Sequence, residues 1–373
     1  MIYYCILGAM ICTSSIEFFN RNTTREKYIF WIEVIFMSLF CGLRFEVGQD
    51  WNQYKEIFEL CESNIIYETY ERGYILLNRF FHLFTDNYYI LQLFIDVAAG
   101  LLIFSAIKKK TTYPIFIVLI YYICNYMFAI DMTMNRLHLA LAIVICGYYF
   151  IDRKNIVGWV CIIFLAMQFH ITSVIAFPLF WTSKIKISRK IALISLTICF
   201  AVSLMGQEFT VSLMEYIQKI PFLPDRISFL FNSYFYNDVA FRHQELSTGF
   251  GLILEYIFYY MIVLLTPKDE EEDAFLLNFI IAIFLQSLSV NFDLLRRLAN
   301  YYMISGFGII AYVRVLNGAF YFRGKRVVCG ESHKTISYIL FLLLIAYRIL
   351  TFSKAFNSSY IIDYCPYQIF LGR

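Results

Sequence analysis

The run IALISLTICFAVSLM, residues 191–205, decides the fold class, because it is apolar on every face that a helix would present. The run YILFLLLIAY, residues 338–347, has the same character. Neither run alternates polar and apolar residues as a membrane β-strand does. Inside a hydrocarbon core, only helices and closed barrels satisfy their own backbone hydrogen bonds. The sequence therefore predicts an all-α, polytopic transmembrane helical bundle.

The composition points to a membrane protein as well. Of the 373 residues, 60% are hydrophobic and 16% are charged, a balance outside that of a soluble domain. A helix needs roughly 20 apolar residues to cross a core of about 30 Å, and charged breaks divide this chain into about 12 such spans. They form a single integral membrane domain, residues 1–373, with predicted spans at 1–19, 27–43, 88–107, 113–130, 135–151, 155–170, 171–183, 190–206, 248–266, 274–291, 297–316 and 335–352.

The distribution of lysine and arginine predicts the orientation of the spans. Short connections rich in these residues stay on the cytoplasmic side of a membrane. Here they alternate along the chain, for example at 21–27, 108–110, 153–154, 184–190 and 314–334. Both termini and the long segments 44–87, 207–247 and 353–373 are then expected on the outer side. Residues 1–10 hold no positive charge, so the first run is expected to remain as a span and not as a cleaved signal.

Two stretches of the first outer segment have helical periodicity. Residues 51–60 and 73–84 repeat apolar and aromatic side chains at helical spacing with charges between them. This pattern predicts interfacial or re-entrant helices on the outer side, and the alternative is an ordinary solvated connection.

Motifs for cofactors, metals and nucleotides are missing from the sequence. There is no Walker, Rossmann or nucleophile-elbow pattern, and the five histidines lack the spacing of metal ligands. The formal charge of +3 comes from connections and does not form a nucleic-acid patch. Most of the ten cysteines lie in apolar runs, and whether Cys61 pairs with Cys365 stays open. We therefore expect no metal, no cofactor and no nucleic acid.

Three arginines lie at predicted outer helix ends: Arg44 in RFEVGQD, Arg136 in MNRLHLA and Arg297 in NFDLLRRLANYY. Arginine is costly near hydrocarbon unless it faces a cavity or a partner. Arg44 could instead pair with Glu46 or Asp50. Arg136, and one of Arg296 and Arg297, could instead extend to the lipid headgroups. Three turns converging on one face favour a shared anionic ligand. A guanidinium suits phosphate, because it offers paired donors and keeps its charge.

His170 lies at a turn before the short segment that contains Pro178. Irregular backbone at membrane depth is tolerated where it lines a polar cavity, which favours a functional His170 over a packed core histidine. An imidazole could accept a proton from a hydroxyl or orient it, and Asp50 is the other candidate base. Inside the spans, Glu33, Asp96, Glu255 and Arg348 are expected to form structural pairs between helices, and the alternative is a polar path.

Four sequence blocks, in this order, resemble the EpsG and Wzy-like polysaccharide polymerases. The matching residues are Arg44, Gly48 and Asp50 in RFEVGQDWNQY, Glu71, Gly73 and Asn78 in YERGYILLNRFF, Arg136 in MNRLHLALAI, and His170 and Ser173 in FHITSVIAFPLF. The resemblance covers most of the chain. One departure is that Leu137 and His138 follow Arg136, where the family more often has Gln and a small residue.

The resemblance implies a metal-independent glycosyltransferase of the bacterial inner membrane with periplasmic termini. Such an enzyme transfers a growing glycan from undecaprenyl pyrophosphate to a sugar hydroxyl of the next lipid-linked repeat unit, which builds O-antigen, capsule or exopolysaccharide. His170, Asp50 and Arg136 would be catalytic. The residues expected to bind pyrophosphate or glycan are Arg44, Arg136, Arg297, Arg296, Tyr301, Glu71 and Asn78. A flippase and a chain-length regulator are the expected protein partners.

Two other functions would also use some of these residues. A transporter or flippase of the lipid-linked glycan would need a polar path through both leaflets, whereas the cations here lie on one side. A membrane O-acetyltransferase would use a histidine, but its acyl donor is cytoplasmic and His170 is predicted on the outer side.

Overall fold

The computed structural model describes residues 1–19, 22–205, 212, 215–216, 250–265, 273–289, 293–304, 308, 311–312, 321–322, 325–326, 331–357 and 361–371. Helices make up most of this part. Its strands are one antiparallel pair of two residues each, β1 Tyr321–Phe322 and β2 Lys325–Arg326. The all-α prediction is therefore confirmed. Most of the predicted outer segment 207–247 lies outside the described residues.

Each range predicted as a span contains a helix. The helices are α1 Ile2–Phe19, α2 Thr23–Gly42, α6 Tyr88–Lys108, α7 Pro114–Ile123, α8 Asn135–Cys146, α9 Tyr148–Asp152, α10 Ile156–Met167, α11 Leu179–Thr182, α12 Arg189–Leu204, α15 Phe250–Leu265, α16 Asp273–Ser289, α17 Asp293–Tyr302 and α19 Glu331–Ala355. Range 113–130 is divided, because Asn125 adopts a left-handed φ of 62° after α7 and a π-helix, η1 Met127–Asp131, follows. α17 begins at Asp293, before the predicted residue 297.

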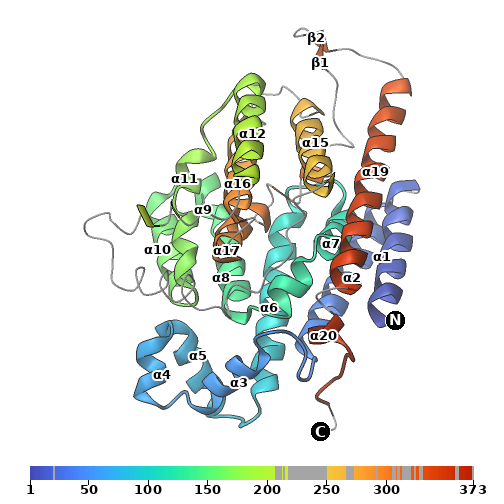
Figure 1. Cartoon of the computed structure of the whole chain (residues 1–373). Helices are drawn as coiled ribbons and strands as arrows, with labels where there is room; N and C mark the ends of the chain where they lie inside the picture. Colours follow the sequence, from blue (N-terminus) through green and yellow to red (C-terminus); the bar gives the residue numbers. More distant parts are fainter. Residues whose placement is uncertain are drawn as a thin grey trace.

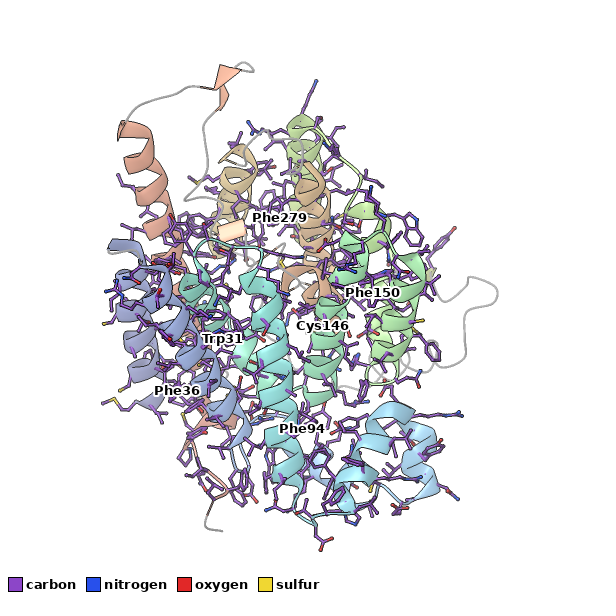
Figure 2. The ribbon with its side chains drawn as sticks, turned by 180° about the vertical axis from the view of Figure 1, so that it is seen from behind. Trp31, Phe36, Phe94, Cys146, Phe150 and Phe279 are labelled. Atoms are coloured by element: carbon purple, nitrogen blue, oxygen red, sulfur yellow. The ribbon has the colours of Figure 1, made fainter. Side chains whose placement is uncertain are left out.

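One helix within the described ranges, α6, is long and apolar enough by itself to cross a membrane. Shorter apolar helices lie in α1, α7, α10, α15 and α16, and in the pair formed by the 3-10 helix η2 Ile171–Ala176 and α11. The number of membrane crossings therefore stays a prediction. Figure 1 shows the longer helices side by side, and large apolar side chains such as Phe36 and Phe94 lie on the outside of this bundle in Figure 2.

A layer of three short helices covers one end of the bundle: α3 Trp51–Glu59, α4 Asn64–Thr69 and α5 Arg72–His82 (Figure 1). The predicted helices at 51–60 and 73–84 are confirmed, and α4 was not predicted. α3 and α5 are amphipathic and bury Tyr54, Phe58 and Tyr74 in a cluster of their own. The amide of Tyr74 donates to the carbonyl of Gln168 at 3.1 Å, which ties α5 to the end of α10.

The C-terminal segment closes the same end of the bundle. After α20 Ile361–Tyr364, the chain runs beside residues 43–48, where the amide of Phe45 donates to the carbonyl of Gln368 at 2.9 Å. Tyr367 stacks on Phe40 with ring centroids 4.1 Å apart. The cysteines of this region, Cys61 and Cys365, are free thiols. Segments at opposite ends of the sequence thus form one rim beside α3.

Gly48 lies in this rim, and we expect Gly48→Ala to destabilise the protein. Its φ of 107° is unfavourable for a residue with a Cβ, and a Cβ would lie 2.0 Å from the carbonyl oxygen of Met132. Backbone strain of this kind costs about 1–3 kcal/mol, and the displaced rim adds to it. Thermal unfolding in detergent measures the loss. Gly8→Ala is the control, because no atom lies within 4 Å of the added methyl group, and an unchanged midpoint for Gly48→Ala would contradict the expectation.

Candidate active site

Arg136 lies in the first turn of α8 and faces the α3–α5 layer. Its Nη1 donates to Oε2 of Glu71 at 2.6 Å. Its guanidinium carbon lies 5.0 Å from the ring centre of Tyr70 and 5.9 Å from that of Tyr54. The Nε atom of Arg136 is buried, and no described residue accepts a hydrogen bond from it. One face of the guanidinium is thus fixed by Glu71 and the aromatic rings, while one donor is still available.

Glu71 joins three elements at this point. It occupies the N-cap position of α5, and its side chain does not cap the helix. One carboxylate oxygen instead pairs with Arg136, and the other accepts a hydrogen bond from the amide of Ile171 at 3.3 Å. Gly73 permits this approach, because a Cβ there would lie 2.6 Å from Cβ of Gln168. The carboxylate therefore fixes α5, α8 and the start of η2 relative to one another.

His170 lies at the break between α10 and η2 and is buried. Its Nδ1 is 2.5 Å from the hydroxyl of Thr172. That hydroxyl donates to the hydroxyl of Tyr301, on α17, at 3.4 Å. The positive charges of Arg136 and Arg297 both act on the imidazole. The ring therefore has one nitrogen held by a neighbour and lies within the field of two guanidinium groups.

α17 completes the group by bringing Arg297 and Tyr301 against η2 and α8. The charges of Arg136 and Arg297 also reach Tyr54: burial raises the pKa of this phenol, and the two arginines act in the opposite direction. We call this group the Arg136 cluster. Its members are Tyr54, Glu71, Arg136, His170, Arg297 and Tyr301. Five of these six residues were predicted for the site, and Tyr54 was not.

Arg44 is fixed in the interior of the bundle. Its side chain is fully buried, and Nη1 pairs with the carboxylate of Asp96 on α6. Nη1 also donates to the carbonyl of Cys41 at 2.6 Å, and Nη2 donates to Oδ1 of Asn135 at 2.9 Å. Asp96 was expected to form a pair between helices, and Arg44 is its partner. The guanidinium therefore holds α2, α6 and the start of α8 together.

His138 extends this group through the two nitrogens of its ring. Nδ1 lies 3.2 Å from Asp96, and Nε2 lies 3.3 Å from Asp131, which accepts a hydrogen bond from Tyr121 at 2.5 Å. We call Arg44, Asp96, Asn135, His138, Asp131 and Tyr121 the Arg44 network. Asn135 precedes Arg136 in α8, so the network supports the residue next to the Arg136 cluster. Sequence reasoning assigned no role to His138 or Asp131.

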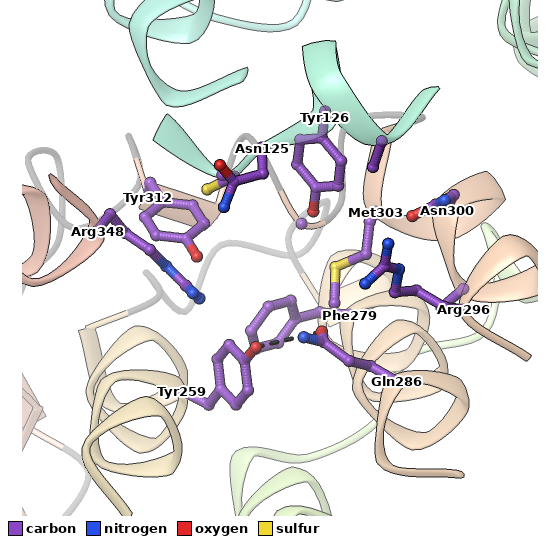
Figure 3. Close-up of a pocket in the computed structure, with 14 residues that line it drawn as sticks. Asn125, Tyr126, Tyr259, Phe279, Gln286, Arg296, Asn300, Met303, Tyr312 and Arg348 are labelled. Carbon is purple, nitrogen blue, oxygen red and sulfur yellow. Dashed lines mark hydrogen bonds between the residues drawn. The ribbon is translucent and has the colours of Figure 1, made fainter. Parts of the chain in front are cut away.

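The other predicted site residues lie around these two groups. Asp50 occupies the N-cap position of α3, and its charge acts on Tyr54, at the edge of the Arg136 cluster. Asn78 is buried in α5 and donates to the carbonyl of Tyr74 at 2.7 Å. Arg296 lines a separate cavity on another side of α17 (Figure 3). The structure thus gathers Asp50 with the Arg136 cluster and places Arg44 and Arg296 elsewhere.

The Arg136 cluster has the groups needed to bind an anion and to accept a proton. Two guanidinium groups can bind phosphate oxygens, and an imidazole beside them can interact with a hydroxyl. Over the described ranges, no three His, Cys, Asp or Glu side chains form a group that could hold a metal ion. In the Arg44 network the two carboxylates contact opposite nitrogens of His138, so they do not converge on one point.

Comparison with known proteins identifies a family. The model of the EpsG family matches residues 27–369, which include every residue of the Arg136 cluster and of the Arg44 network. No curated protein matches the chain, and no solved structure matches it. The match begins in α2 and ends in the rim formed by the C-terminal segment.

Proposed function

The chain belongs to the EpsG family, and from this premise we propose that it polymerises lipid-linked oligosaccharides. Membership makes it a membrane protein of the polysaccharide-polymerase type. The proposed reaction moves a growing glycan from undecaprenyl pyrophosphate to the sugar hydroxyl of a new lipid-linked repeat unit. The polymer would be an O-antigen, a capsule or an exopolysaccharide.

The proposed reaction breaks one bond and forms one. The acceptor hydroxyl oxygen attacks the anomeric carbon of the donor, the bond from that carbon to the phosphate oxygen breaks, and the hydroxyl proton is lost. Negative charge develops on the departing pyrophosphate, and preorganised donors that face such charge are a large source of catalysis. The lipid pyrophosphate is already activated, so the reaction needs no nucleotide sugar and no cofactor.

The observation that carries the proposal is the geometry around Arg136. The guanidinium is held by Glu71 at 2.6 Å and by two tyrosine rings, so its position is fixed before a ligand arrives. Its buried Nε is a donor with no acceptor among the described residues. A second guanidinium, from Arg297, lies close enough to act on the same imidazole. We assign the leaving pyrophosphate to these two arginines, with Tyr301 beside them.

His170 is the group we assign to the acceptor hydroxyl. Thr172 holds Nδ1 at 2.5 Å, which fixes the plane of the ring and reserves Nε2 for the substrate. Asp50 is the second candidate for the proton, because it lies at the edge of the same cluster beside Tyr54. We favour His170, because the contact with Thr172 fixes its ring beside the arginines assigned to the pyrophosphate.

The proposed setting is the bacterial inner membrane, crossed about 12 times, as the length of the apolar runs suggests. The α3–α5 layer, the rim and both described ends of the chain lie toward one end of the bundle (Figure 1). We place that end in the periplasm, because the lysine-rich connections belong to the other of the two alternating sets of connections, the set expected on the cytoplasmic side. The proposed partners are the lipid-linked substrate, a flippase that delivers it and a chain-length regulator.

Reconstitution tests this function directly. Lipid-linked repeat units would be isolated from cells that lack the gene and added to purified protein in proteoliposomes without nucleotide sugar or added metal. We expect a ladder of products that differ by one repeat unit, separated on a gel and identified by mass spectrometry. Substrate that crosses the bilayer without extension would instead establish a flippase. Incorporation of an acyl group without extension would establish an acetyltransferase, and either result would refute the polymerase.

A further inference from the structure

A cavity of about 170 Å³ lies between the helices on another side of α17 from His170. Its described walls come from α15, α16, α17, α19, the break after α7, η1, and Gly308 and Tyr312. Figure 3 shows the side chains of Tyr126, Tyr312 and Arg296 pointing toward a common space. The Arg136 cluster contributes no residue to these walls. The cavity is therefore a second candidate site within the same bundle.

The walls combine aromatic rings with planar polar groups. Tyr126, Tyr259, Phe279 and Tyr312 supply the rings, and Asn125, Gln286 and Asn300 supply side-chain amides. An amide offers both donors and acceptors, which matches sugar hydroxyls, and an aromatic face packs against the C–H face of a sugar ring. Binding sites for small molecules are concave, largely apolar and carry a few placed polar groups.

Two buried polar atoms in these walls lack partners among the described residues. They are Oδ1 of Asn125, an acceptor, and Nε of Arg348, a donor. Asn125 holds a left-handed φ of 62°, which aims its side chain from the break between α7 and η1. A buried polar atom without a partner is destabilising, so an acceptor and a donor left open in one cavity point to a ligand that hydrogen-bonds to both.

The charges in the cavity favour a sugar over a diphosphate. Arg348 pairs with Glu255 at 2.7 Å, and Glu255 also accepts from Tyr259 at 2.6 Å, so the charge of Arg348 is balanced within the wall. Arg296 is the other cation in the described walls. A diphosphate would bind more favourably to the two guanidinium groups of the Arg136 cluster. One cation among amides and phenols suits a hydroxylated ring.

The sequence of α17 connects the two sites. Arg296 and Arg297 are consecutive, and successive helical residues point about 100° apart. Arg297 acts on His170, while Arg296 lines the cavity. A rigid helix can therefore contact two parts of one substrate, or two substrates, at the same time.

We propose that this cavity binds a sugar ring of the repeat unit, separately from the pyrophosphate contact at Arg136 and Arg297. The inference rests on the proposed function for the identity of the glycan. Arg296, Asn300 and Gln286 then select the repeat unit through its hydroxyl groups. The Arg136 cluster performs the transfer.

Calorimetric titration of the purified full chain with two separate probes tests the assignment. One probe is the lipid-free oligosaccharide released by mild acid from the accumulated repeat units, and the other is inorganic diphosphate. Ala299→Leu would fill the cavity without removing a polar group, and Asn300→Ala would remove one amide. We expect each to weaken oligosaccharide binding about tenfold and to leave diphosphate binding unchanged. Arg297→Gln should do the reverse.

The matched control is Asn64→Ala, an exposed amide at the start of α4, which should change neither affinity. Variants would be compared only where their unfolding midpoints match that of the parent. The proposal is refuted if diphosphate competes with the oligosaccharide, or if Ala299→Leu and Asn300→Ala bind the oligosaccharide as the parent does. If the parent protein binds the oligosaccharide in the cavity but makes no polymer, the proposed polymerase activity is refuted and the sugar-binding site is still supported.

Discussion

Arg136→Gln should lower the rate of polymerisation by about a hundredfold or more. Glutamine keeps some of the length of the side chain but removes the charge that we assign to the departing pyrophosphate. Removing one preorganised donor from such a site costs about 10²–10³ in rate. The loss should appear in kcat, because the negative charge on the leaving group is greater in the transition state than in the bound substrate. The measurement is the initial rate of ladder formation in proteoliposomes, at saturating lipid-linked repeat unit.

Three comparisons make this result specific to the cluster. Arg72→Gln removes one positive charge from an exposed position in the same layer, and its rate should equal that of the parent. Arg136→Lys keeps the charge but loses the paired donors, so an intermediate rate is expected. Glu71→Gln should lower the rate less than Arg136→Gln, since it loosens the guanidinium without removing it. Full activity in folded Arg136→Gln would remove Arg136 from the mechanism.

Asp96→Asn should lower the free energy of unfolding by about 3–5 kcal/mol, the usual cost of leaving a buried charge uncompensated. The partner that loses its counter-charge is Arg44, and both side chains are almost completely buried. The same carboxylate contacts His138 at 3.2 Å, so two cationic or polar groups lose a negatively charged partner together. Thermal or denaturant unfolding in detergent micelles measures the change.

A double substitution distinguishes a lost ion pair from general damage to the core. Arg44→Gln with Asp96→Asn removes both charges. The double variant should therefore lose less unfolding free energy than the sum of the losses in the two single variants. The exposed pair of Lys55 and Glu59, 4.0 Å apart, is the control, and Glu59→Gln should have no measurable effect. Additive losses in the Arg44 and Asp96 cycle would show that the two side chains do not stabilise each other.

Much of the helical architecture could be predicted from hydrophobic runs. A helix that is apolar on all faces can be recognised from its own sequence, without knowing which helices pack against it. The run at 338–347 lies within α19, and the run at 191–205 lies in α12 up to its cap residue, Met205. The interruptions were harder to predict, since they depend on single residues. Asn125 ends α7 through its left-handed backbone, and the π-helix that follows has no signal in the apolar pattern.

The candidate site was predictable in its residue types and only partly in its grouping. Arg136, His170 and Arg297 could be selected because charged residues at the ends of apolar runs are rare and costly. Arg44 satisfied the same criterion, yet it is the partner of Asp96 inside the bundle. Sequence reasoning considered only the neighbours Glu46 and Asp50 for Arg44, and a partner 52 residues away cannot be selected from local spacing.

The cavity on the other side of α17 could not be predicted at all. Its polar lining is spread over segments from residue 124 to residue 348, and amides or tyrosines inside apolar runs resemble ordinary packing residues. Sequence reasoning favoured Arg297 for the anionic ligand, but it assigned Arg296 to the same site. Their separation needed the rotation of α17 about its own axis, which only the packing against α16 and η2 determines.

The rim also has a consequence for biosynthesis. Gln49 donates to Asp363, which the ribosome adds 314 residues later, and Tyr364 contacts Thr133 across 231 residues. Contacts this far apart in sequence form late, because each requires a long loop to close. A nascent chain can therefore insert most of its helices while the end that holds the Arg136 cluster is still open. We expect the rim to form only after residue 370 has been translated, because the amide of Phe370 donates to the carbonyl of Leu43.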